Sequence, residues 1–93
     1  MIIKLVKFGE ILISRPAGRE AFLAMKAYLT KDLKENEEII VDFSEVKVLT
    51  PSWADEVITK LAEKFTNIKL INADNTTVKS TLDTLRQYSG LKI

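Results

Sequence analysis

The side chains that can take part in chemistry gather between residues 42 and 56 of this 93-residue chain. Asp42 closes an apolar run, and Thr50 and Ser52 flank Pro51 at the predicted start of a helix. In open α/β sheets, the carboxyl ends of parallel strands and the helix N-termini that follow them form the usual ligand edge, where backbone N–H groups favour an anion. A phosphate on Ser52 or Thr50 would lie at this edge. Both hydroxyls are therefore candidates for phosphorylation.

Ordinary helix capping explains the same residues, and this second interpretation stays open. Ser52 and Asp55 have the spacing of a capping box, and Thr50 before Pro51 is an equally common cap. Asp42, at the end of a strand, can hold loop amides by hydrogen bonds.

Trp53, the only tryptophan of the chain, also has two interpretations. It stands beside the apolar stripe that begins at Ala54, so it either anchors a partner on an exposed surface or folds over the loop as a core residue. Asp55 and Glu56 are neighbours, and on a helix their side chains point about 100° apart, which predicts that they do not share a site. The candidate partner-binding side chains are those of Asp42, Ser44, Trp53, Asp55 and Glu56.

Composition narrows the possible chemistry. The chain has no cysteine and no histidine, which removes disulfides, thiolate nucleophiles, cysteine-based zinc sites and the commonest general base. With three glycines there is no Gly-rich phosphate loop. Fourteen basic and thirteen acidic residues alternate along the chain, so no basic face for nucleic acid is expected. We expect no catalysis, no metal and no cofactor.

The length and hydropathy of the chain predict a single domain over residues 1–93. No secretory leader opens the sequence, and no apolar run approaches the roughly 20 residues that span a bilayer. We therefore expect a cytoplasmic protein that does not enter a membrane.

The N-terminal part predicts a β-hairpin followed by a helix. Residues 2–8 and 11–13 are rich in β-branched side chains, and a two-residue turn separates them. Pro16 suits the first helical position, with Ser14 or Arg15 as the cap. The expected apolar stripe of this helix consists of Ala21, Phe22, Met25, Leu29 and Leu33.

The remainder alternates strands and helices. Residues 39–43 are nearly all apolar, as in a central strand covered on both faces. A helix opened by residues 50–52 carries the most regular stripe of the chain, formed by Ala54, Val57, Ile58, Leu61, Ala62 and Phe65. Residues 68–73 then predict a strand, and Thr76 or Thr77 caps a last helix that ends near Gly90.

These elements predict an α/β fold with the order hairpin, helix, strand, helix, strand, helix. The two strand–helix–strand steps require right-handed crossovers and parallel pairing, whereas the hairpin is antiparallel. The result is a mixed sheet of about four strands with helices packed on it.

The segment at residues 41–52 resembles the signature loop of STAS domains, the family of anti-sigma-factor antagonists. The chain resembles even more closely a small STAS-like family of unknown function, DUF4325, through Ser-Arg-Pro-Ala-Gly-Arg at residues 14–19 and Ser-Trp-Ala-Asp-Glu at residues 52–56. The resemblance implies a STAS-like fold in which Ser52 occupies the place of the serine that a partner kinase phosphorylates. Thr50 takes the place of the aspartate two residues earlier, and Trp53 the place of a glycine.

The resemblance implies a regulatory module of prokaryotic signalling that acts by protein–protein interaction and has a GHKL-type ATPase or kinase as partner. A phosphate on Ser52 adds about two negative charges and would release such a partner. Two alternatives stay open. One is a small-molecule or nucleotide-binding domain at the same strand ends, and the other is a structural homodimer that pairs the edge of the strand at residues 2–8.

Overall fold

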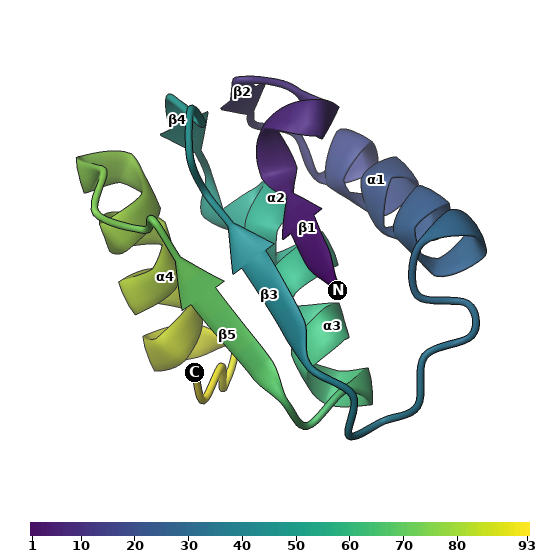
Figure 1. The fold of residues 1–93 in the computed structure, drawn as a ribbon. Coiled ribbons are helices and arrows are strands. Elements are labelled where there is room, and N and C mark those ends of the chain that lie inside the picture. The colour runs from purple at the N-terminus through teal and green to yellow at the C-terminus, as the bar shows by residue number, and fades with distance from the viewer.

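The structure is a computed structural model that describes all 93 residues, and it has an α/β fold with two small parallel sheets (Figure 1). The larger sheet has the strand order β1-β3-β5, and the smaller one pairs β2 with β4. The strands are β1 (Ile2–Lys4), β2 (Ile11–Leu12), β3 (Ile39–Asp42), β4 (Val48–Leu49) and β5 (Ile68–Ile71). The helices are α1 (Arg15–Tyr28), α2 (Pro51–Ala54), α3 (Lys60–Lys64) and α4 (Thr76–Tyr88), and a π-helical segment (Asp55–Thr59) joins α2 to α3.

All helices cover the same face of the larger sheet. The chain crosses from β1 to β3 through α1, and from β3 to β5 through α2 and α3, so both crossovers run in the same direction across the sheet. Two right-handed crossovers in one direction place their helices on one face. Figure 1 shows α2 and α3 behind the sheet, with α1 and α4 on either side of them. Ile3 and its partner Val41 face the helices and are buried, whereas Ile2 and Lys4 are exposed. In the central strand β3, Ile39, Val41 and Asp42 are buried and Ile40 is half-buried, so the strand is largely covered, as expected, although all helices lie on one face.

The predicted N-terminal hairpin is also wrong. After β1 the chain forms a 3-10 turn (Leu5–Phe8), and β1 and β2 pair in parallel with β3 and β4 instead of with each other. Leu5 and Leu12 are both buried, and the turn directs each of them into the core. Gly9 permits this path because it adopts a φ of 134°, which side chains disfavour. The chain thus has three and two parallel strands in place of a mixed four-stranded sheet.

Helix α1 begins as its sequence predicts. The Ser14 hydroxyl accepts a hydrogen bond from the Ala17 amide at 3.2 Å, and Pro16 lies in the first turn. Its stripe is shorter than expected, because the helix ends at Tyr28, before Leu29 and Leu33.

Helices α2 and α3 form one continuous helix, and the part that follows its exposed first two residues is buried on almost every side. Trp53, Ala54 and all residues from 56 to 59 are buried, because α1, α4 and the sheet surround this part of the helix. The predicted apolar stripe is confirmed, but the burial extends beyond it. Two polar residues, Glu56 and Thr59, are consequently enclosed in the fold.

The C-terminal helix α4 is capped by Asn75 and not by Thr76 or Thr77. The Asn75 side-chain oxygen accepts from the amides of Thr77 and Val78 at 2.8 and 3.3 Å. The helix ends before Gly90, as predicted, and Leu91 then packs back into the core. No helix of the structure combines the length and the apolar character needed to cross a bilayer.

Candidate functional site

The candidate site begins at the carboxyl end of β3, where Asp42 organises the following loop. One of its oxygens, Oδ1, accepts hydrogen bonds from the Ser44 amide at 2.9 Å, from the Ser44 hydroxyl, and from the Asn72 side chain at 2.9 Å. These bonds, that of Asn72 first, lower the pKa of Asp42 to about 2. Asp42 therefore holds loop amides, as one of its two sequence interpretations expects, and it binds Ser44 directly.

A hollow lies next to this cluster, at the ends of β3 and β5. Glu45 and Asp74 contribute carboxylates to its lining, and the one cation, Lys47, forms an ion pair with Glu10 at 3.2 Å. The lining is acidic overall, which opposes the binding of a phosphate group. No group of three or more potential ligand side chains gathers closely enough to hold a metal ion.

The start of α2 shows which of the predicted caps is used. The Thr50 hydroxyl accepts a hydrogen bond from the Trp53 amide at 3.3 Å and donates one to the Ile13 carbonyl. Pro51 occupies the first helical position. The predicted capping box of Ser52 with Asp55 does not form, because Thr50 already caps the helix. Ser52 is exposed in the first turn, and its hydroxyl takes part in none of the side-chain hydrogen bonds of the structure.

Trp53 is a core residue, so the interpretation as an exposed partner anchor is wrong. Only 1% of its surface is exposed, and its ring lies 6.5 Å from that of Phe8. Helix α1 crosses α2 at this point, and Gly18 makes the close crossing possible. A Cβ atom at Gly18 would lie 2.7 Å from the Trp53 carbonyl oxygen, so the two backbones are already in contact. The crossing helix leaves Trp53 no path to the surface.

Asp55 and Glu56 share one guanidinium group, contrary to the expectation that they act separately. Arg15 Nη1 lies 3.0 Å from an Asp55 oxygen and 3.2 Å from Glu56 Oε1. The Arg15 side chain extends from the start of α1 and is long enough to reach both carboxylates. It therefore joins Asp55 and Glu56 although their side chains point in different directions. Burial is the largest single effect on Asp55 and would raise its pKa, but Arg15, Thr59 and Ser89 together favour the charged carboxylate and keep the pKa below its usual value.

Glu56 is the centre of this ion-pair cluster. Its side chain is 7% exposed, and it contacts Arg15, Arg19 at 3.4 Å, and Lys60 one turn later on the same helix. The hydrogen bond from Lys60, and next to it that from Arg15, lowers the pKa of Glu56 against the effect of burial. A buried carboxylate is stable only with such partners.

The family of the chain follows from a comparison with family models. A model described as a STAS-like domain of unknown function, DUF4325, matches residues 26–78, which is more than half of the chain. The chain belongs to this STAS-like family. The resemblance found in the sequence is thus confirmed, and the match covers the loop after β3 and the whole start of α2. No curated protein and no solved structure matched the chain.

The predicted site residues of this STAS-like domain separate into two groups. Asp42 and Ser44 lie together at the strand end, while Ser52 and Asp55 lie on the outer side of α2 and Trp53 is internal. Sequence reasoning about Asp55 and Glu56 missed their basic partners, which are Arg15, Arg19 and Lys60. The spacing of Glu56 and Lys60 is the i,i+4 pattern of helix ion pairs and could have indicated one of them.

Proposed function

We propose that this STAS-like domain is a non-enzymatic regulatory module of cytoplasmic prokaryotic signalling, which binds a protein partner through the Ser52 end of α2. Phosphorylation of Ser52 weakens the contact. By family likeness the partner is a GHKL-type ATPase or kinase. The observation that carries the proposal is the exposed Ser52 hydroxyl, which is free because Thr50 supplies the helix cap.

The helix start suits a phosphate at Ser52. The positive end of the helix dipole favours an anion there, so the fold tolerates the modification. Asp55 and Glu56, three and four residues later on the same helix face, oppose a phosphate, but Arg15 pairs with both carboxylates and offsets their charge. The modification adds about two negative charges to a surface on which Asp55, Arg15 and Arg19 carry both signs, and the added charge repels a partner that is acidic or requires a dry contact.

Thr50 is the weaker candidate for phosphorylation. Its hydroxyl donates to the Ile13 carbonyl and accepts from the Trp53 amide, and a phosphate would disrupt both bonds. Loss of such a cap costs about 1 kcal/mol. We therefore assign the switch to Ser52 alone.

The partner surface in this proposal consists of Ser52, Asp55 and the exposed portions of Arg15 and Arg19, whose side chains are 44% and 55% exposed. It mixes both signs of charge, so it fits a partner with a complementary mixed surface. Trp53 contributes only by holding α2 in place.

The two alternatives have less support. Nucleotide binding at the ends of β3 and β5 would place phosphates beside Glu45 and Asp74. A homodimer through paired hairpin edges lacks its hairpin, although β1 is still an edge strand of the sheet.

The test is an affinity pull-down from lysate of the source organism with wild-type protein and a Ser52→Asp variant. We expect at least one partner to be held by wild type and released by the variant, with binding weakened about ten-fold or about 1.4 kcal/mol. Thr76→Asp is the matched control, because it places the same charge in the exposed first turn of α4. Identical partners for all three proteins would refute the switch.

A further inference from the structure

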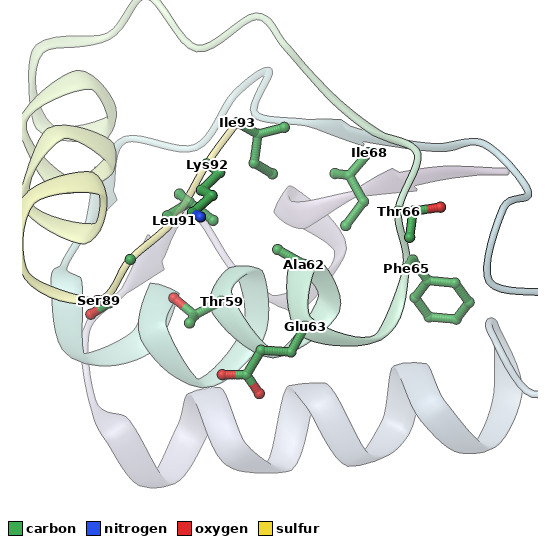
Figure 2. A pocket seen from close by; sticks show the side chains of 11 residues that line it. Thr59, Ala62, Glu63, Phe65, Thr66, Ile68, Ser89, Leu91, Lys92 and Ile93 are labelled. Carbon is green, nitrogen blue, oxygen red and sulfur yellow. The ribbon is translucent and has the colours of Figure 1, made fainter.

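A cavity of about 350 Å³ lies between α3, the start of β5 and the chain after α4 (Figure 2). This volume is within the range of small-molecule sites. The lining residues are Thr59, Ala62, Glu63, Phe65, Thr66, Ile68, Ser89, Gly90, Leu91, Lys92 and Ile93.

Five of the eleven residues that line this cavity are apolar, and four of them lie around its centre. Ala62 comes from α3, Ile68 from β5, and Leu91 and Ile93 from the C-terminal segment, and Figure 2 shows these four side chains around one space. Ile68 and Leu91 are themselves buried, so the inner wall belongs to the hydrophobic core. A ligand with an aliphatic or aromatic body would remove further apolar surface from water here.

The charged lining residues do not select an ion. Glu63 and Lys92 are both exposed and carry opposite charges, so their effects on a charged ligand oppose each other. An ionised group placed against the apolar walls would lose its hydration without gaining a buried partner. An uncharged molecule fits the cavity better.

Thr59 supplies one polar point in the inner wall. Its residue surface is 9% exposed, and its hydroxyl oxygen is buried without a hydrogen-bond partner. Asp55 lies one turn earlier, near enough for the hydroxyl to favour its charged form, but no hydrogen bond of normal length joins the two. In Figure 2 the Thr59 side chain lies on the side of the helix that faces Ser89 and Leu91. A buried hydroxyl is unfavourable until a partner satisfies it.

The backbone next to Thr59 is unusual as well. The π-helical segment Asp55–Thr59 ends at this residue. Single π-turns inside α-helices are rare and occur frequently at functional sites. The unpaired hydroxyl and the irregular turn therefore coincide at the cavity wall.

We propose that this cavity binds a small uncharged amphipathic molecule with an aliphatic or aromatic body and one hydroxyl or carbonyl group that hydrogen-bonds Thr59 Oγ1. The cavity adjoins the partner surface at Asp55, which lies next to Thr59, but Ser52 is not among its lining residues. Phenol binding can therefore be measured without phosphorylation of Ser52.

Phenol is a suitable probe, because it combines an aromatic body with one hydroxyl group. The experiment titrates phenol into the isotope-labelled protein and follows the amide signals by NMR. We expect saturable shifts confined to the lining residues, with Thr59→Val binding about five-fold more weakly through the loss of one hydrogen bond. Thr59→Val should be about as stable to urea as wild type, because removal of an unsatisfied buried hydroxyl offsets the loss of its effect on Asp55. If Thr59 were needed only for folding, its replacement by valine would lower the stability instead.

A second variant makes the test independent of Thr59. Ala62→Leu fills the cavity and is expected to abolish the phenol shifts, whereas Ala27→Leu, the same change at an exposed position of α1, should leave them unchanged. Benzoate, the charged analogue of the probe, should bind more weakly than phenol. The proposal is overturned if the shifts do not saturate, if they lie outside the cavity, or if Ala62→Leu binds phenol as wild type does.

Discussion

Replacement of Gly18 by alanine should destabilise the protein, although the same change in an open helix is stabilising. The added Cβ would lie 2.7 Å from the Trp53 carbonyl oxygen and 3.0 Å from Trp53 Cα, and both are backbone atoms of a buried helix. Neither atom can rotate away as a flexible side chain would. The two helices must therefore separate at their crossing.

The size of the effect follows from these distances. Ordinary contact begins near 3.4 Å, so α1 has to move outward by about 0.7 Å. Overpacking of this kind costs about 1–3 kcal/mol, and the gain in helix propensity from glycine to alanine returns about 1 kcal/mol. Because the obstacle is backbone, we expect the upper half of that range and a net loss of about 1–2 kcal/mol.

Urea unfolding followed by fluorescence measures this loss directly, because Trp53 is the only tryptophan and is buried at the contact itself. Far-UV circular dichroism on the same samples checks that both probes report one transition. Ala27→Gly, at an exposed position of α1, is the calibration for propensity and should cost about 1 kcal/mol. If Gly18→Ala is as stable as wild type or more stable, the close crossing of α1 and α2 is refuted.

Two further predictions concern the carboxylates of the site. The pKa of Asp42 is about 2 in the fold against 3.8 for the free group, so its contribution is present above pH 4 and is lost as the pH falls from about 4 to about 2. In the Asp42→Asn variant the free energy of unfolding should consequently fall less steeply between about pH 4 and about pH 2 than in wild type, as measured by urea unfolding at several pH values. The same slope in both proteins would contradict this role of Asp42. Glu56→Gln should lower the free energy of unfolding by about 1–2 kcal/mol at neutral pH, because it weakens charge-assisted hydrogen bonds to Arg15 and Lys60. The exposed Glu20→Gln is its control, with an expected change within about 0.5 kcal/mol, and equal effects of the two substitutions would show that the buried cluster adds nothing.

Elements defined by short-range patterns could be predicted from the sequence. The cap at Ser14 and the stripe that starts at Ala54 involve residues within one or two turns of each other, so spacing alone identifies them. The cap of α4 was assigned wrongly because three adjacent polar residues, beginning with Asn75, were all acceptable. Only the chain direction on entering the helix distinguishes them.

The N-terminal hairpin failed for a different reason. Its two apolar runs favour strands, but a strand can pair with any other strand, and β1 pairs with β3 and not with β2. The local sequence pattern therefore predicts a strand, but it does not predict which strand it pairs with.

The environment of α2 depends on contacts that are distant in sequence. Trp53 is buried because α1 crosses over it, and Arg15 reaches Asp55 and Glu56 from the start of that same helix. One signal was present in the sequence: Gly18 inside a predicted helix is unfavourable by about 1 kcal/mol and indicates a close approach to another backbone. Combined with the small residue Ala54 on α2, it could have suggested the crossing.

The all-parallel pairing of the strands has a consequence for how the chain folds. Ile2 pairs with Ile40, Ile11 with Val48, and Ile39 with Ile68, so no strand can pair before a long loop has closed. Without a hairpin there is no local nucleus of sheet, and only the helices can form early. Folding should therefore be slow for a chain of this length.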